Sequence, residues 1–190
     1  MGPVQNQGSC SCCWSFAATG AYQSYLSLNG FNYELSVEAA LECTSFYAPD
    51  NRVSDCSGGF FPDPLTFLSK VGSVLESSYP YLAGNYGTRS GYPHSSNICS
   101  DKNRIFLGEG SVNIYAPIIA FGGLTVDQIK TILVINGPQM IAVFANNAFM
   151  SYSSGTFSGC PDNAYAFINH AILLVGWNKN GWICKNQWGT

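Results

Sequence analysis

The sequence predicts an α+β protein with a helical, cysteine-rich first half and a mostly β second half. Two observations lead to this class. Before residue 72, apolar and small residues recur at three- and four-residue spacing, which is typical of buried helices. After residue 108, apolar residues alternate or form short continuous runs, which is typical of strands. We therefore place a boundary between two halves near residues 105–110.

Three helices are expected in the first half. The first begins at residues 12–13 and ends at Asn29-Gly30, because these two residue types tolerate positive φ. The second follows Ser36, whose hydroxyl is a good N-cap. The third opens at Asp63-Pro64, since proline suits the first helical position, and it ends before Gly72.

The remaining elements alternate between loop, strand and helix. Residues 79–103 are rich in Gly, Ser, Tyr, Pro and Asn and are expected to form a long loop system. A strand is expected at residues 111–115 and a helix over residues 126–135. Three apolar runs then predict strands, the last two joined by the turn residues Asn178–Gly181: 140–144, 171–177 and 182–185.

Composition limits the classes of function. Hydrophobic residues make up 46% of the chain and charged residues only 10%, so a packed globular protein is expected. The net charge of −3 offers no basic patch for nucleic acid, and no run of about 18 apolar residues predicts a membrane span. Eight cysteines indicate a secreted or endomembrane-lumen protein with disulfides, although a cytosolic protein with buried free thiols is the alternative.

The segment Gln7–Phe16 holds three cysteines in four positions, directly before the first predicted helix. A thiol in the first turn of a helix lies where unpaired backbone N–H groups and the helix dipole favour negative charge. This environment is expected to lower the thiol pKa and to raise the fraction of nucleophilic thiolate. Cys13 is therefore the candidate nucleophile.

A nucleophilic cysteine needs a base and a group that orients the base. The chain has two histidines, and His94 lies in a polar loop where a solvated surface role is the simpler interpretation. His170 opens an apolar run, a position that by itself is more typical of a structural histidine. Asn186, at the end of the adjoining run, can accept the imidazole N–H and fix its tautomer, and Trp188 can cover that hydrogen bond.

These segments resemble those of papain-like cysteine proteases, in particular the cathepsin L-like endopeptidases. Gln7–Phe16 is similar to the family pattern Q-G-x-C-G-[SA]-C-[WY]-[AS]-F, Asn169–Ala171 to its histidine segment, and Lys185–Gly189 to K-N-S-W-G. Smaller landmarks fall in the family's order: Leu35-Ser36 before Cys43, Cys56–Gly59, and Tyr79–Tyr81. The resemblance covers almost the whole chain.

The resemblance implies a papain-like two-domain fold with the site in the cleft between the domains. The helical domain spans residues 8–108, and the β-rich domain is formed by residues 1–7 and 109–190. In the implied roles, Cys13 attacks the scissile carbonyl, and His170 forms an ion pair with Cys13 and later protonates the leaving amine. Asn186 orients the imidazole, while Gln7 and the backbone N–H of Cys13 bind the oxyanion.

The resemblance also implies a set of substrate-binding residues: Gly58, Gly59, Phe60, Phe61, Ala142, Ile168, Asn169 and Trp188. The backbone of the second glycine pairs with an extended substrate. Four members align with the pocket for the second residue on the acyl side, namely Phe60, Phe61, Ala142 and Ile168. All four are apolar, which predicts a preference for a hydrophobic or aromatic residue, and ordinary core packing is the competing interpretation.

The cysteines can be assigned by the same resemblance. It implies the disulfides Cys10–Cys56 and Cys43–Cys99 and leaves Cys13 free. Cys160 resembles a half-cystine whose partner lies further along the family's chain. Cys184 has no such counterpart and is expected to be a buried thiol within a strand.

Several features depart from the family pattern. Ser11-Cys12 stands where the family has Gly followed by Ser or Ala, and Gln187 replaces the usual Ser beside Asn186. We hypothesise that Cys12 makes the site easier to inactivate by oxidation, through a strained vicinal disulfide with Cys13. The chain is also shorter than the family pattern at both ends, and no targeting segment precedes Pro3, which predicts that the sequence is incomplete.

The function predicted by the resemblance is a cysteine endopeptidase that needs no cofactor and is made as a zymogen in a lysosomal, vacuolar, digestive or secreted setting. Its expected partners are polypeptide substrates, its own propeptide and cystatin-like inhibitors. The alternative is a catalytically impaired relative that acts as a structural or binding component. A metal site on Cys10, Cys12 and Cys13 is disfavoured, because cysteines so close together suit a tetrahedral zinc site poorly.

Overall fold

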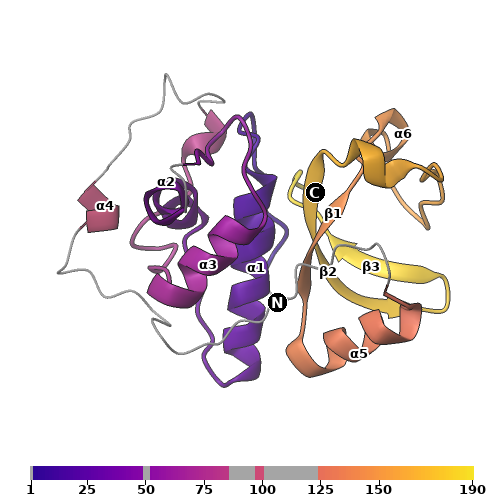
Figure 1. Cartoon of the computed structure of the whole chain (residues 1–190), viewed down its shortest axis with the longest axis horizontal. Coiled ribbons are helices and arrows are strands. Elements are labelled where there is room, and N and C mark those ends of the chain that lie inside the picture. The colour runs from indigo at the N-terminus through magenta and orange to yellow at the C-terminus, as the bar shows by residue number, and fades with distance from the viewer. Residues whose placement is uncertain (1, 49–51, 86–96, 101–123) are drawn as a thin grey trace.

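The computed structural model describes residues 2–48, 52–85, 97–100 and 124–190 of the 190-residue chain. It places the described helices α1–α4 in the first half and a three-stranded sheet in the second (Figure 1). His94, the strand expected at 111–115, most of the loop expected at 79–103 and the boundary near 105–110 lie outside these residues. The division into domains of residues 8–108 and of residues 1–7 with 109–190 therefore stays a prediction.

Helix α1 (Cys13–Leu28) is the central element of the fold. It packs against α2 (Val37–Tyr47) and α3 (Pro62–Val71) on one side and against the sheet on the other, as Figure 1 shows. Because α1 is covered on both sides, most of its first half is buried, including the whole run Trp14–Thr19. Two short helices, η2 (Ala83–Asn85) and α4 (Asn97–Ser100), complete the described part of this half.

Local signals account for most helix ends. Ser36 caps α2 as expected, since its Oγ accepts the N–H of Ala39 at 2.9 Å. Helix α3 begins at Pro62 rather than at Asp63-Pro64, because Pro62 occupies a first helical position where its missing N–H costs no hydrogen bond. Asp63 is buried and accepts a hydrogen bond from Arg52 at 3.1 Å instead of capping the helix.

The sheet consists of β1 (Gln139–Val143), β2 (His170–Asn178) and β3 (Gly181–Lys185), all antiparallel with β2 in the centre. The bounds of these strands agree to within one residue at each end with the strands predicted from the three apolar runs. Helix α5 (Val126–Asn136) also agrees with its prediction and packs Ile129 and Leu133 onto the sheet. Short helices α6 (Asn147–Met150) and η4 (Ala164–Phe167) lie between β1 and β2 in the chain.

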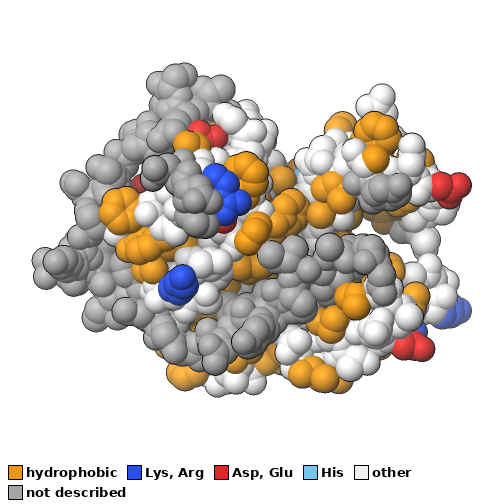
Figure 2. Space-filling view, viewed as in Figure 1, with side chains coloured by type: hydrophobic (Ala, Val, Ile, Leu, Met, Phe, Trp, Pro, Cys, Tyr) orange, Lys and Arg blue, Asp and Glu red, His pale blue; other side chains and the backbone are white. Residues whose placement is uncertain are grey.

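The core joins the two halves instead of stopping between them. Met140, Ala171 and Leu173 of the sheet belong to the same buried cluster as α1–α3. A Cβ on Gly20 of α1 would lie 3.2 Å from the Leu173 side chain, so the helix approaches β2 closely. This contact places the N-terminus of α1 near the start of β2. On the face shown in Figure 2, a hollow between the halves has hydrophobic side chains on its walls.

Two disulfides join Cys10 to Cys56 and Cys43 to Cys99, the pairs implied by the family resemblance. They close loops of 46 and 56 residues within the helical half. Cys184 lies in β3 as predicted, but the residue as a whole is exposed instead of buried, because the described part of the chain leaves most of this edge strand uncovered. Its thiol is nevertheless partly desolvated, which raises its pKa to about 11.

The N-terminal segment lies against the C-terminal one. Asn6 forms a β-bridge with Trp188, the Gln7 N–H donates to the Gln187 carbonyl at 2.8 Å, and the Gly189 N–H donates to the Gln5 carbonyl at 3.0 Å. Residues 5–7 are thus paired with the β half before the chain enters α1. Within the described residues, no helix combines the length and the apolar character needed to cross a bilayer.

Two buried carboxyl groups support the loop before α1. Glu38 is 2% exposed, and its Oε2 accepts the N–H groups of Leu82 and Ala83 at 3.0 and 3.2 Å. Burial raises the pKa of Glu38 and of Glu76, although backbone N–H groups offset part of the rise, and the charge of Glu76 raises the Glu38 pKa further. The residue that follows Leu82 and Ala83 supports the loop directly, since the Ser9 N–H donates to the Gly84 carbonyl at 2.9 Å.

We predict that Glu38→Gln reduces the pH dependence of stability. A carboxyl with a raised pKa in the folded state contributes stability that is fully present below its unfolded pKa, near 4.5, and is lost as the pH rises through the folded value. The free energy of unfolding of the wild type should therefore fall more than that of E38Q between pH 4.5 and 7. Urea unfolding at both pH values measures this difference, with the exposed-site variant Asp162→Asn as control, and parallel profiles for wild type and E38Q would contradict the prediction.

Candidate active site

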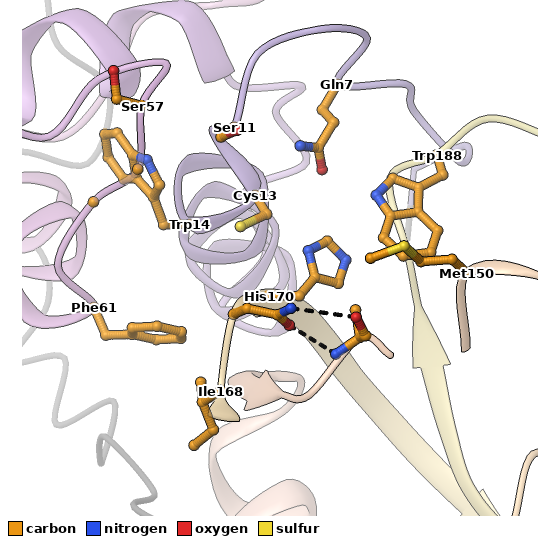
Figure 3. A pocket seen from close by; sticks show the side chains of 14 residues that line it. Gln7, Ser11, Cys13, Trp14, Ser57, Phe61, Met150, Ile168, His170 and Trp188 are labelled. Atoms are coloured by element: carbon orange, nitrogen blue, oxygen red, sulfur yellow. Dashed lines mark hydrogen bonds between the residues drawn. The ribbon is translucent and has the colours of Figure 1, made fainter. Parts of the chain in front are cut away.

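Cys13 and His170 meet in one pocket of about 400 Å³ between the two halves. Cys13 is the first residue of α1, and His170 is the first residue of β2. Figure 3 shows the imidazole of His170 between the Cys13 thiol and the Trp188 indole. The pocket is lined by residues from both halves: Gln7, Ser11, Cys13, Trp14, Ser57, Gly58, Gly59, Phe61, Ala145, Met150, Ile168, Asn169, His170 and Trp188.

The first turn of α1 is held rigidly from the helical side. Trp14 is 1% exposed, and its indole N–H donates to the Asp55 carbonyl at 3.3 Å. A Cβ on Gly59 would lie 2.5 Å from that indole, so only glycine lets the backbone pass this close. The Ser11 N–H donates to the Cys56 carbonyl at 2.9 Å, beside the disulfide. Cys13 therefore projects from a helix end fixed at several points.

The imidazole of His170 is oriented from the β side. Its Nε2 lies 2.9 Å from Oδ1 of Asn186, and the same oxygen accepts the N–H of Gln187 at 2.9 Å. Because the Asn186 oxygen can only accept a hydrogen bond, Nε2 must carry a proton. In the neutral imidazole, Nδ1 is then unprotonated. The ring stacks on Trp188 with a centroid distance of 4.6 Å and an interplanar angle of 26°. This arrangement matches the sequence-based expectation for Asn186 and Trp188.

Burial determines the ionisation of this pair. It raises the pKa of the Cys13 thiol above its usual 9.0, and the backbone N–H groups of Ala171, Trp14 and Cys13 offset only part of the rise. It also lowers the pKa of His170 below 6.5, with a partial offset from the Asn186 hydrogen bond. The lowered Cys13 pKa expected from the helix N-terminus is therefore not found, because desolvation outweighs the helix contribution. Each group taken alone is neutral at pH 7.

Gln7 lies at the rim of the pocket, with its amide nitrogen on the side of Cys13 in Figure 3. Its Nε2 donates to the Cys10 carbonyl at 2.8 Å, and its Oε1 accepts from Nε2 of Gln187 at 3.2 Å. Its own carbonyl accepts from the Tyr81 hydroxyl at 2.8 Å. Both ends of this residue are thus held by neighbours.

Most of the predicted substrate-binding residues line the pocket, but two do not. Gly58, Gly59, Phe61, Ile168, Asn169 and Trp188 are among the lining residues. Phe60 is outside the pocket and 48% exposed, and the guanidinium of Arg52 lies 5.1 Å from its ring centroid. Ala142 is paired with Ala171 inside the sheet.

The sequence analysis missed several lining residues. Ala145 and Met150 stand out, because they add apolar surface to the lining, and Figure 3 shows Met150 beside Trp188. Ala145 is held by a pair of hydrogen bonds to the Asn169 side chain, at 2.8 and 3.3 Å and dashed in Figure 3. Met150 ends the short helix α6, whose N-cap Asn146 is the only local signal for it in the sequence. Neither position could be assigned to the pocket without the tertiary arrangement.

Cys12 points away from the pocket and is fully buried. Its Sγ lies 3.0 Å from the hydroxyl oxygen of Tyr81. The Cys12 thiol also donates to the Cys10 carbonyl at 3.7 Å, and the Tyr81 hydroxyl donates to the Gln7 carbonyl at 2.8 Å. Burial raises the Cys12 pKa to about 12. The structure therefore does not support an oxidation-prone Cys12, and the disulfide of Cys10 removes one thiol from the three-cysteine metal alternative.

Comparison with known proteins agrees with this geometry. A family model described as papain family cysteine protease matches residues 1–190. The chain is 33% identical over 209 residues to cysteine proteinase 1 of Zea mays, a match that covers 100% of this chain and 50% of the relative. It is 29% identical over 192 residues to a cathepsin L-like proteinase of Fasciola hepatica, with coverages of 98% and 52%.

Solved structures show the same fold. Bromelain protease from Ananas comosus matches with a TM-score of 0.68 and 27% identity, covering 99% of this chain and 78% of that one. A digestive procathepsin L 3 of Tenebrio molitor larval midgut matches with a TM-score of 0.69 and 26% identity, with coverages of 100% and 57%. The chain belongs to the papain family of cysteine proteases and spans about half the length of the curated relatives that it matches.

We predict that iodoacetamide leaves Cys12 unmodified in the folded protein. With a pKa of about 12 instead of 9.0, its thiolate fraction at pH 8 is smaller by about a thousandfold, and burial blocks access as well. Peptide mapping after brief labelling should find Cys13 and the exposed Cys160 modified, Cys184 modified more slowly because its pKa is raised to about 11, and Cys12 modified only after unfolding. Labelling of Cys12 at a rate similar to Cys160 would contradict the assignment.

Proposed function

We propose that this chain is a cysteine endopeptidase in which Cys13 is the nucleophile and His170 the acid–base group. The observation that carries the proposal is the shared pocket of Cys13 and His170, with the second imidazole nitrogen bonded to Asn186. A thiol, an imidazole and an orienting amide in this order form the constellation that nucleophilic acyl transfer needs.

The pKa directions suggest how the thiolate forms. Because burial favours the neutral forms of both Cys13 and His170, we propose that Nδ1 takes the thiol proton as the sulfur attacks the substrate carbonyl. The ion pair implied by the family resemblance then arises during the attack. The imidazolium keeps its Nε2–H on Asn186 and its face on Trp188, and both contacts favour the charged ring.

The later steps follow from the same groups. His170 gives its Nδ1 proton to the leaving amine, the C–N bond breaks, and the acyl group remains on the Cys13 sulfur as a thioester. A water molecule then gives a proton to His170 as its oxygen attacks the thioester carbonyl, and the carboxylic acid leaves while the proton returns to the sulfur. In each tetrahedral intermediate we assign the oxyanion to the Gln7 amide and the Cys13 backbone N–H, and one such donor contributes about 2.7–4 kcal/mol at the transition state.

The pocket walls support a peptide substrate with a hydrophobic second residue on its acyl side. Gly58 and Gly59 line the pocket without side chains, which leaves their backbone accessible to an extended peptide. The side of the pocket where Figure 3 shows Phe61 and Ile168 is apolar. No described acidic side chain lines the pocket, so nothing there would offset the burial of a substrate charge.

The setting and partners of the enzyme are part of the same proposal. Two disulfides suit an oxidising compartment, so we propose a lysosomal, vacuolar or secreted location. Synthesis as a zymogen, and control by a propeptide or by cystatin-like inhibitors that occupy the same cleft, fit an endopeptidase of this family.

We predict that a thiol-directed epoxide inhibitor adds once to the folded protein, at Cys13. Intact mass and peptide mapping measure the adduct, and Cys13→Ala should abolish both the adduct and the hydrolysis of a fluorogenic peptide. His170→Ala should reduce kcat by about 10²-fold or more, because general acid–base catalysis contributes about 10²–10⁴-fold. Folded protein that forms no Cys13 adduct would favour the structural or binding alternative.

We also predict that peptides with Phe or Leu at the second acyl-side position are hydrolysed with a kcat/KM at least about tenfold above that of the Arg peptide, since an apolar pocket discriminates by about 1–3 kcal/mol. Steady-state kinetics on a series that varies this position alone measures the ratio. Phe61→Ala should reduce the advantage of Phe, while Phe60→Ala, outside the pocket, is the matched control. A preference for Arg would refute this assignment.

A further inference from the structure

Gln187 stands where the resembling family segment has serine, and it lies behind the pocket rather than in its lining. Its side chain is almost fully buried, with 4% exposed. A buried primary amide needs partners for both its oxygen and its nitrogen, so its contacts carry information about its role. We propose that Gln187 is a positioning residue that fixes the orientation of the Gln7 amide, an inference that rests on the proposed function.

The contacts of Gln187 reach both sides of the site. Its Nε2 donates to the Ala171 carbonyl at 2.8 Å and to Oε1 of Gln7 at 3.2 Å. Its backbone carbonyl accepts the Gln7 N–H at 2.8 Å, and its backbone N–H donates to Oδ1 of Asn186 at 2.9 Å. One residue therefore contacts the proposed oxyanion donor through its side chain and the group that orients His170 through its backbone.

The polarity of these contacts determines how both amides lie. The Ala171 carbonyl can only accept, so the Gln187 atom that faces it is the nitrogen. The second hydrogen of that nitrogen points to Gln7, which must present its oxygen. At the other end of the Gln7 amide, the Cys10 carbonyl also can only accept, so it requires the Gln7 nitrogen. Two backbone carbonyls thus allow one orientation of the pair.

This orientation directs a donor toward the proposed oxyanion. The Gln7 nitrogen carries two hydrogens and gives one of them to Cys10. The other is available to a group bound at the rim of the pocket, which Gln7 lines. A flipped Gln7 would set its oxygen against the Cys10 carbonyl and its nitrogen against the Gln187 nitrogen, and both contacts would be lost. Gln187 therefore disfavours the flipped state that presents an acceptor to the oxyanion.

The test separates the side chain of Gln187 from its backbone. Gln187→Met keeps a similar length and the backbone hydrogen bonds but removes the amide. We expect kcat for a fluorogenic peptide to fall about 5- to 50-fold, with KM changed less than twofold, because an oxyanion donor acts in the transition state. Alkylation of Cys13 by iodoacetamide forms no oxyanion and should keep its wild-type rate. Gln187→Ser, a smaller side chain that fits the same space, should lower kcat in the same direction.

The decisive comparison uses a Gln7→Ala background. If Gln187 acts through Gln7, Q187M should cause no further loss of kcat in Q7A. The inference is overturned if Q187M has the wild-type kcat. It is also overturned if Q187M lowers kcat as much in the Q7A background as in the wild type, because the loss of kcat would then arise through Ala171 or Asn186. Failure of the proposed function is a distinct result, since wild-type protein would then neither hydrolyse peptide nor be alkylated at Cys13, and the positioning role would fall with it.

Discussion

The packing of α1 against β2 is the interaction on which the site depends. It brings the first residue of a helix, Cys13, beside the first residue of a strand, His170, although 157 positions separate them. Gly20 permits this close approach, because even an added Cβ would lie 3.2 Å from the Leu173 side chain, closer than an ordinary van der Waals contact. The disulfide at Cys10 and the glycine contact on Trp14 then set the direction in which the thiol points.

Desolvation is the second consequence of this packing. The sequence places Cys13 at a helix start, which by itself predicts an acidic thiol, yet burial has the larger effect and gives a raised pKa. The same burial lowers the pKa of His170. Each group taken alone is therefore neutral in the empty site, and in the proposed mechanism the two charges arise as the thiol attacks the substrate. Asn186 and Trp188 contact the imidazole that would carry the positive charge, and Gln7 is the proposed donor to the oxyanion.

Features with a local cause could be predicted from the sequence. The cap at Ser36, the hairpin at Asn178–Gly181 and the helix beginning at Cys13 each depend on neighbouring residues. The strand at His170 and its partner Asn186 were found through paired motifs. Features decided by distant parts of the chain could not be predicted. Cys12 turns toward Tyr81 and Met150 lines the pocket because of the tertiary arrangement, and Cys184 is exposed because the described chain leaves its strand uncovered.

The pairing of residues 5–7 with 187–189 has a kinetic consequence. Asn186 and Gln187 directly follow β3, which is an edge strand of the described sheet, and its residues are mostly exposed, so few contacts within the described residues resist its local opening. If this edge frays, the imidazole and the Gln7 amide lose their anchors in a single event, while the helical core with its two disulfides stays folded. The geometry of the proposed site and global folding are therefore separable within the described residues. We expect the lifetime of the assembled site to depend on this edge more than on the core.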